Sequence, residues 1–173
     1  MKIAHAIKTL DSHTDKPEKG LPYDFFMFIS RKTPIVNVDL LIKDKEGRTL
    51  LAWRNDKYSG AGWHVPGGII RYKEKMEKRI NEVAKLEIGT KVKFNKEPLA
   101  INQIILNQKE RAHFISFLFH CAVKDGFVPA NKGLKSGDAG YLKWHDKCPA
   151  DLIKVHKIYK KYMNNKGACD DFK

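Results

Sequence analysis

Apolar runs alternate with short polar breaks along most of the chain, a pattern typical of a sheet built from several strands. The strand-like runs are IVNVDLLI at 35–42, TLLAWR at 49–54, PLAINQIILN at 98–107, AHFISFLFHCAV at 112–123 and YLKWH at 141–145. Polar KDKEGR separates the first two runs and charged QKER separates the third and fourth. Each of these two pairs is therefore predicted to form a hairpin.

Three other segments have helical patterns. The stretch LPYDFFMFISRKTP groups its apolar residues into a predicted short helix that ends before Pro34. A second helix is predicted after the paired glycines at 67–68, with Gly89 as its C-terminal cap. Within 149–165, Leu152, Val155, Tyr159 and Tyr162 recur at helical spacing opposite lysines, which predicts a C-terminal helix. Interspersed strands and helices indicate a mixed α/β sandwich.

The chain has 173 residues, enough for one domain with a sizeable core and too few for two ordinary ones. Residues 1–20 are polar and charged and are predicted to be a loosely attached lead-in. The single domain is expected over 21–165, with 166–173 as a C-terminal tail. We find no signal-peptide run and no stretch of about eighteen consecutive apolar residues, so neither secretion nor a membrane partner is expected.

The cysteine count and the charge narrow the cellular setting and the type of ligand. Cys121, Cys148 and Cys169 lack the spacing of a zinc site or a disulfide framework, which favours thiols in the cytoplasm. A formal net charge of +13, from 33 Lys and Arg against 20 Asp and Glu, suits an anionic partner such as a nucleotide or nucleic acid. A lysine-rich solvated surface explains the charge equally well, because the lysines are spread along the chain.

The candidate chemistry lies in residues 62–90, GWHVPGGIIRYKEKMEKRINEVAKLEIGT. Gly67 and Gly68 are predicted to form a turn whose backbone approaches a phosphate closely and adopts angles closed to other residues. Glu74 follows Gly68 after five intervening residues, and Glu87 stands near the end of the predicted helix, just before Gly89. The stretch therefore joins a glycine turn to a helix that carries carboxylates at fixed distances.

This frame resembles the Nudix box, in which Gly68, Glu74, Glu87 and Gly89 fall in register. The resemblance implies an α/β/α sandwich around a central mixed sheet and the hydrolysis of a nucleoside diphosphate linked to another group. It also implies that carboxylates hold Mg²⁺ or Mn²⁺ against the diphosphate, which suits hard cations that take oxygen ligands.

The box departs from the family pattern at several positions. Glu82 and Val83 stand where the pattern has arginine and glutamate, and Leu86 stands where it has another glutamate. Val83 removes a carboxylate that would share the helix face of Glu87. The missing arginine would brace Glu74, so either a lysine or Arg79 takes over that role or the brace is absent.

The similarity extends from about Tyr23 to Trp144 and is greatest to the GDP-mannose mannosyl hydrolases, which also carry a single glutamate before the closing glycine. Segments like YDFFMFISRKTPIVNVDLLI and EGRTLLAWRN precede GWHVPGG in that subgroup. In these enzymes water attacks C1 of the sugar with inversion. The resemblance thus implies a nucleoside diphosphate sugar as substrate and, by analogy, a homodimer.

The resemblance assigns roles to individual residues. Asp39, Arg54 and Gly68 would contact substrate, and Arg54 would also brace charge on the leaving group in a catalytic role. Metal ligands would come from the three positions Gly67 (through its carbonyl), Glu87 and Asp138.

Two subgroup residues are missing. The arginine after the double glycine is Ile69, and the general base falls on Ala139, which cannot accept a proton. The base is therefore unassigned. His113 and His145 are the nearest candidates in sequence, although a lone histidine on an apolar strand is more often structural.

Two functions of different classes remain open. The first is a Nudix hydrolase that uses a divalent cation on a nucleoside diphosphate sugar or a related compound. The second is a Nudix-fold module that binds a nucleotide, or less favourably a nucleic acid, without turnover. The absent acids, the absent base and the charge of +13 favour the binding module. The joint presence of Asp39, Arg54 and Glu87 favours the hydrolase.

Overall fold

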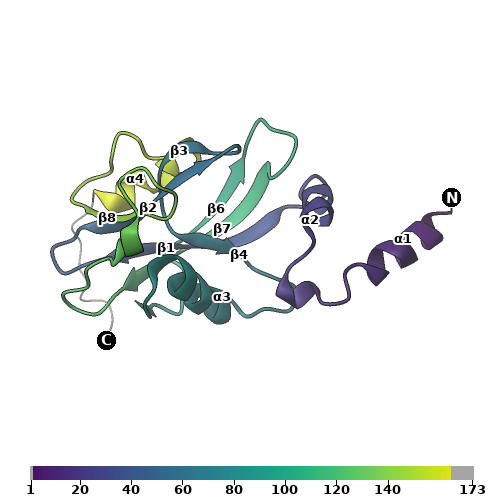
Figure 1. The fold of residues 1–173 in the computed structure, drawn as a ribbon, viewed down its shortest axis with the longest axis horizontal. Helices are drawn as coiled ribbons and strands as arrows, with labels where there is room; N and C mark the ends of the chain where they lie inside the picture. Colours follow the sequence, from purple (N-terminus) through teal and green to yellow (C-terminus); the bar gives the residue numbers. More distant parts are fainter. Residues whose placement is uncertain (1, 165–173) are drawn as a thin grey trace.

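The structure is a computed structural model that describes residues 2–164, and its centre is an eight-stranded mixed sheet (Figure 1). Strand order is β3-β2-β1-β7-β5, with β4 paired to β1, β6 to β7 and β8 to β2. The strands are β1 Ile35–Lys43, β2 Thr49–Asp56, β3 Gly60–His64, β4 Gly67–Ile69, β5 Lys93–Phe94, β6 Ala100–Ile105, β7 His113–Ala122 and β8 Leu142–His145. All five strands predicted from apolar runs are present, and β1 with β2 and β6 with β7 are antiparallel pairs.

Strands β1 and β7 form the parallel centre of the sheet, in register from Ile35 opposite Phe114 to Lys43 opposite Ala122. Elements cover β1 on both faces, which explains its nearly continuous apolar sequence. Successive strand residues point to opposite faces, so Leu40 packs in one core cluster and Leu41 in another. Both faces of the sheet therefore carry a hydrophobic core.

The helical elements lie around this sheet. They are α1 Ile3–Ser12, the 3₁₀ turn η1 Pro17–Lys19, α2 Tyr23–Ile29, α3 Met76–Val83, a π-helical turn η2 Ala84–Ile88, the 3₁₀ turns η3 Asn131–Gly133 and η4 Lys154–Tyr159, and α4 Lys160–Met163. Helix α3 contributes Ile80 and Val83 to one core cluster, and the C-terminal elements contribute Tyr159 and Met163 to the other. The α/β/α arrangement predicted from the sequence is confirmed.

The lead-in contains a helix that was not predicted, and the C-terminal end of the described chain differs from its prediction. Within the lead-in, α1 is a helix that extends away from the domain (Figure 1), and none of its residues is buried. The predicted C-terminal helix is wrong in type, because residues 154–159 are 3₁₀ and only 160–163 are α-helical. Leu152, which was predicted to be helical, lies before these turns and forms a β-bridge with Trp63. The predicted tail at 166–173 lies outside the described residues.

Cys121 and Cys148 are both free thiols, as predicted, whereas Cys169 lies outside the described residues. Burial raises the pKa of the Cys121 thiol, so that side chain is an inert part of the core. Within residues 2–164, no helix combines the length and the apolar content needed to cross a membrane.

Candidate functional site

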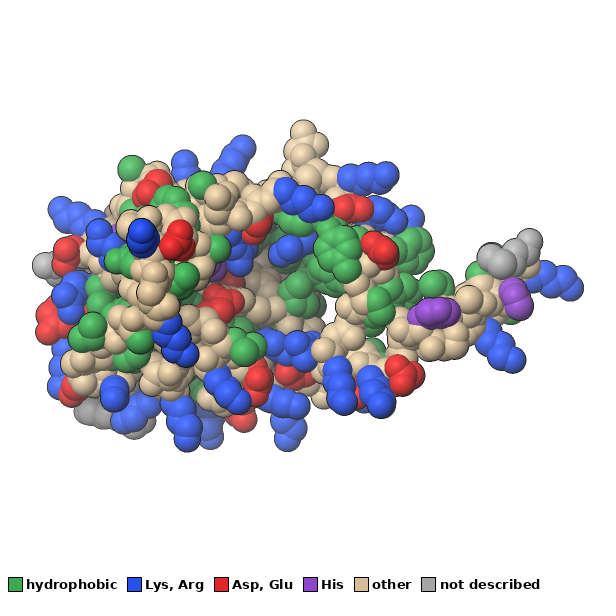
Figure 2. All heavy atoms as spheres, in the orientation of Figure 1, with side chains coloured by type: hydrophobic (Ala, Val, Ile, Leu, Met, Phe, Trp, Pro, Cys, Tyr) green, Lys and Arg blue, Asp and Glu red, His purple; other side chains and the backbone are tan. Residues whose placement is uncertain are grey.

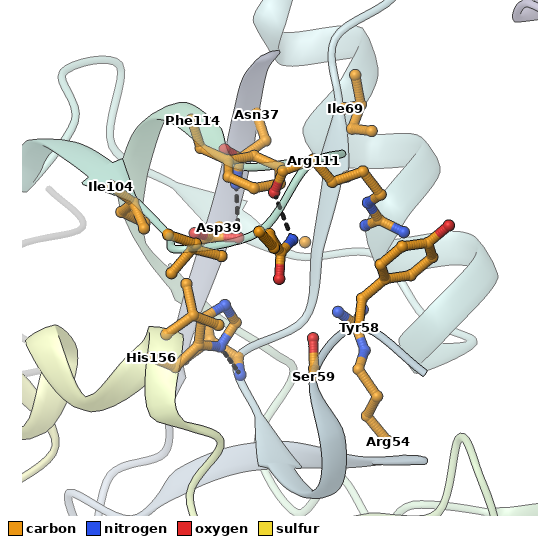
Figure 3. Close-up of a pocket in the computed structure, with 16 residues that line it drawn as sticks. Asn37, Asp39, Arg54, Tyr58, Ser59, Ile69, Ile104, Arg111, Phe114 and His156 are labelled. Carbon is orange, nitrogen blue, oxygen red and sulfur yellow. Dashed lines mark hydrogen bonds between the residues drawn. The ribbon is translucent and has the colours of Figure 1, made fainter. Parts of the chain in front are cut away.

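A pocket opens beside the paired glycines, and four of the predicted site residues line it (Figure 3). Asp39 comes from β1, Arg54 from β2, and Gly67 and Gly68 from β4. Antiparallel pairing places Asp39 opposite Gly67, which is why a strand residue and a glycine-motif residue meet here. The structure thus brings together residues that the sequence analysis could associate only by resemblance.

Gly67 and Gly68 lie in a strand, so the predicted glycine turn is wrong, and neither has a left-handed φ. The other part of the prediction, close approach, is correct for packing reasons. A Cβ on Gly67 would overlap the Asp39 carboxyl and lie 2.8 Å from the Val38 carbonyl oxygen. A Cβ on Gly68 would lie 2.6 Å from Val83 Cγ2. Glycine is required so that β4 fits between β1 and α3.

Asp39 is a buried carboxyl held by three side-chain donors. Asn37 Nδ2 donates to Oδ1 at 3.0 Å, while Ser116 Oγ and Tyr159 Oη donate to Oδ2 at 2.6 and 2.5 Å. Burial raises the pKa of Asp39, and these hydrogen bonds only partly oppose the rise. A carboxylate has about four acceptor positions, so three internal donors leave one for a ligand.

Two guanidinium groups reach the same pocket. Arg54 comes from β2 and Arg111 from the connection between β6 and β7. The Arg54 Nε lies 3.5 Å from Asp56 Oδ2, and the Arg111 guanidinium carbon lies 5.0 Å from the centre of the Tyr58 ring. Burial and the neighbouring charge of Arg54 lower the pKa of Arg111. This concentration of positive charge suits a diphosphate.

Glu87 lies on the π-helical turn that follows α3. Its Oε2 is 3.6 Å from Nε2 of the buried His64, and its side chain is 29% exposed. Gly89 adopts a left-handed φ of 77° and ends the helical segment, which confirms the predicted cap. The Nδ1 atom of His64 is buried and has no hydrogen-bond partner among the described residues. Glu87 is therefore directed towards an imidazole and does not line the pocket of Asp39 and Arg54.

The departures from the Nudix pattern now have structural consequences. Val83 is buried in the core beneath β4, where the family has a carboxylate. Leu86 is 71% exposed and supplies no ligand. The brace for Glu74 is present, because Arg79 takes the place of the missing arginine. The helix therefore keeps its internal ion pair while its set of acids is reduced.

Asp138, the third predicted metal ligand, is exposed in the loop before β8. Its Oδ2 accepts a hydrogen bond from the Lys135 backbone N–H at 2.7 Å, and it does not line the pocket. Across residues 2–164, no three His, Cys, Asp or Glu side chains gather closely enough to hold a metal ion by themselves. The donors that suit a hard cation are the Glu87 carboxylate and the Gly67 carbonyl. By chemistry these are one carboxylate and one carbonyl, the oxygen ligands that a hard cation takes, although only Gly67 lines the pocket.

The two histidines considered as bases lie outside the pocket lining. His113 Nε2 is 3.0 Å from Gln103 Nε2 across the β6–β7 pair, and the His145 ring packs edge-on against Trp63 at 4.4 Å. Burial lowers the pKa of His145. A different histidine, His156, does line the pocket, but its Nδ1 accepts the Val65 backbone N–H at 2.9 Å.

Sequence reasoning missed several residues of the site, among them Ser116, Tyr159, Arg111 and His156. Ser116 is the lone hydroxyl in the apolar run of β7, and it lies opposite Asn37 of β1. Because side chains alternate between the two faces of a strand, Ser116 shares a face with Asn37 and Asp39, and this polar position was a usable signal. Arg111 carried no such signal, because it stood in a short charged connection. Tyr159 was considered only as part of a helical pattern, and His156 was not singled out.

Basic side chains are dispersed over the surface seen in Figure 2. Lys and Arg stand between acidic and apolar groups on that face and do not form one continuous stripe. On this face the basic side chains have the dispersed arrangement expected of a solvated surface.

No protein-family model matches the chain. One curated relative, the low-salt glycan biosynthesis protein Agl8 of Haloferax volcanii, is 35% identical over 81 residues, which are 47% of this chain and 51% of that protein. The chain thus spans about half the length of this curated relative.

Solved structures with similar folds are Nudix hydrolases and a diphosphatase. A MutT Nudix hydrolase from Burkholderia pseudomallei has a TM-score of 0.59 at 20% identity, over 76% of this chain and 98% of that one. A Nudix-family hydrolase from Clostridium perfringens has a TM-score of 0.54 at 16% identity, over 76% and 97%. A UDP-X diphosphatase has a TM-score of 0.54 at 19% identity, over 92% and 76%. Identities this low establish the fold alone: the chain has the Nudix hydrolase fold.

Proposed function

We propose that this protein is a Nudix-type hydrolase of a nucleoside diphosphate-linked compound, with a nucleotide sugar of the GDP-mannose kind as the substrate class. The observation that carries the proposal is one pocket that combines the guanidinium groups of Arg54 and Arg111 with the buried carboxyl of Asp39. The Nudix hydrolase fold and the partial similarity to a glycan biosynthesis protein support the same substrate class.

Each pocket residue has a physical role in this proposal. The diphosphate lies beside the backbone of Gly67 and Gly68, where Arg54 offers charge-assisted hydrogen bonds to the leaving group. Asp39 uses its remaining acceptor position for a substrate hydroxyl. Glu87 and the Gly67 carbonyl would hold Mg²⁺ or Mn²⁺, which when bound neutralises charge on the diphosphate oxygens. Asp138 as a further ligand and a homodimer both remain predictions.

The test is product formation from a panel of nucleotide sugars with and without Mg²⁺. Turnover in ¹⁸O-labelled water places the label in the sugar hydroxyl after attack at carbon, or in the phosphate after attack at phosphorus. Glu87→Gln is expected to lower Mg²⁺-dependent turnover at least about tenfold. Glu77→Gln is the matched control, since it removes the same charge from an exposed position on α3, the helix that directly precedes the turn of Glu87. Absence of turnover with every substrate, or equal turnover in both variants, would contradict the proposal.

The second candidate function is nucleotide binding without turnover. It is favoured by the buried Val83 and by the lack of a clustered acid set in the described residues. It predicts saturable binding of GDP with no product formed from any nucleotide sugar. A steep loss of RNA affinity with added salt, again without turnover, would point to the nucleic-acid form of this alternative.

A further inference from the structure

Arg111 occupies an unusual position in the pocket. It has a φ of 51°, a left-handed conformation that non-glycine residues rarely adopt. Its side chain is directed towards Tyr58 and the pocket (Figure 3), and no ion pair within 4.0 Å links it to a carboxylate of residues 2–164. Its Nε is buried without a hydrogen-bond partner among the described residues. A guanidinium that lines a pocket without an internal acceptor is suited to bind an anionic ligand.

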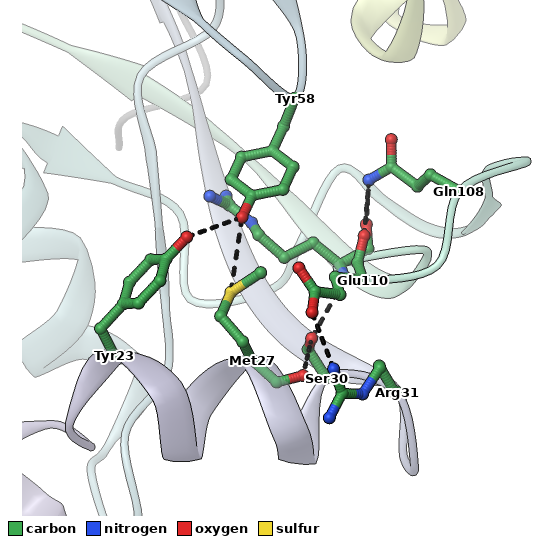
Figure 4. A network of polar contacts seen from close by, with 8 residues as sticks. Tyr23, Met27, Ser30, Arg31, Tyr58, Gln108 and Glu110 are labelled. Carbon is green, nitrogen blue, oxygen red and sulfur yellow. Dashed lines mark hydrogen bonds and ion pairs between the residues drawn. The ribbon is translucent and has the colours of Figure 1, made fainter.

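Contacts from two segments, one with Ser30 and the other with Gln108 (Figure 4), hold Arg111 in place. The Arg111 backbone N–H donates to Ser30 Oγ at 3.2 Å, and its carbonyl accepts from Gln108 Nε2 at 2.9 Å. The neighbouring Glu110 forms an ion pair of 2.8 Å with Arg31. Helix α2 and the residues directly after it therefore fix the connection between β6 and β7. An unfavourable backbone conformation fixed by several contacts is typical of a functional position.

The ring of Tyr58 is also fixed from outside the pocket. Tyr23 and Tyr58 hydroxyl oxygens are 2.9 Å apart, and the Tyr58 hydroxyl donates to Met27 Sδ at 3.8 Å. In the view of Figure 3 the ring lies between the ends of Arg54 and Arg111. Both arginines therefore line one pocket together with this fixed ring and the glycine strand β4.

We propose that Arg111 and Arg54 form a two-arginine clamp that binds the diphosphate of the substrate, and that this binding does not require a divalent cation. The inference rests on the proposed function and names the residue that supplies the second positive charge. Ile69 lines the same pocket and offers no charge, so the clamp depends on Arg111.

The test is isothermal titration calorimetry with inorganic pyrophosphate and with GDP, both in EDTA. Arg111→Gln is expected to weaken both affinities by about 10- to 100-fold, because one charge-assisted donor is lost. Lys109→Gln is the control: it removes one positive charge from the same connection, and Lys109 does not line the pocket. Arg111→Gln combined with Ile69→Arg places a guanidinium in the pocket from another strand and is expected to recover part of the loss. The thermal unfolding transition of each variant shows whether it is folded, so that a weaker affinity can be attributed to the binding site.

Equal pyrophosphate affinity in Arg111→Gln and the unmodified protein would overturn the clamp, as would no pyrophosphate binding by the unmodified protein in EDTA. If Arg111→Gln does not fold, Arg111→Lys keeps the charge without the planar fork and is expected to give a smaller loss; an unchanged affinity in that variant overturns the clamp too. If nucleotide sugars are hydrolysed but binding does not depend on Arg111, the proposed hydrolase stands and the clamp is rejected. If binding depends on Arg111 but no nucleotide sugar is hydrolysed, the clamp stands and the proposed hydrolase is rejected.

Discussion

Arg79 binds both carboxylate oxygens of Glu74, with its Nε and Nη2 each donating a hydrogen bond of 2.8 Å. The Arg71 backbone N–H donates to the same carboxylate at 3.0 Å. Burial acts to raise the pKa of Glu74, but these hydrogen bonds and the arginine charges lower it below its usual value. The pair links the loop after β4 to the first turns of α3.

Arg79→Met is expected to lower the free energy of unfolding by about 3 kcal/mol, since it leaves a carboxylate with little exposure and without its paired guanidinium. The two side chains are only 7% and 5% exposed. Urea denaturation followed by circular dichroism measures the change. The comparison variant is Arg48→Met, because the Arg48 side chain pairs with Asp44 but is 40% exposed. Its free energy of unfolding is expected to fall by no more than about 1 kcal/mol. Equal losses in the two variants would contradict the bracing role.

Asp39 is expected to make stability fall as pH rises. Its folded-state pKa is raised, whereas in the unfolded chain it is about 3.9. Between the two values the folded protein holds a proton that the unfolded chain has released, so the free energy of unfolding decreases with pH, by at most about 1.4 kcal/mol per unit. Asp39→Asn cannot titrate and should lack this component. Urea unfolding of both proteins from pH 4 to 8 checks it, and parallel profiles would refute it.

His156 is expected to act with the opposite sign. Burial, with the charges of His64 and Arg54, holds the pKa of His156 well below its usual value, and its Nδ1 must stay unprotonated to accept the Val65 N–H. The unfolded chain takes up a proton near pH 6.5, so stability contributed by His156 is present above that pH and is lost progressively as pH falls towards the folded-state pKa. His156→Asn keeps an acceptor near the Nδ1 position without titrating. A shallower acid limb in its unfolding profile is the expected result; an unchanged limb counts against the assignment.

Gly68→Ala is expected to destabilise the protein by about 1–3 kcal/mol, because the added methyl group would lie 2.6 Å from Val83 Cγ2 in the core. Val83→Ala removes that obstacle. The double variant should therefore lose less stability than the sum of the two single variants, a coupling that a double-mutant cycle from urea unfolding measures directly. Strict additivity would show that β4 can move away from α3 without cost.

The sheet could be predicted from the sequence because its strands are defined by local pattern. The runs at 35–42 and 112–123 are apolar on both faces, and each became a strand of the parallel centre. Four residues of the pocket, Asp39, Arg54, Gly67 and Gly68, were also predicted, because each stands in a motif matched by resemblance.

The other pocket residues depend on contacts between distant segments, which local pattern does not encode. Arg111 is placed by Ser30 and Gln108, so a charged connection became part of a pocket wall. The C-terminal segment has helical spacing, but the bond from Val65 to His156 and the bridge from Leu152 to Trp63 hold it in another conformation. The turn at Gly67 and Gly68 failed as a prediction because glycine there provides space and no special backbone angle.

The parallel pairing of Ile35 with Phe114 also governs the order in which the protein is assembled. During synthesis β1 emerges early, but its central partner leaves the ribosome only after the glycine strand, α3 and β6 have been made. Until then one edge of a strongly apolar strand has no native neighbour, and closing so long a loop is slow. Nascent chains that stop before residue 113 should therefore be the species that require chaperones.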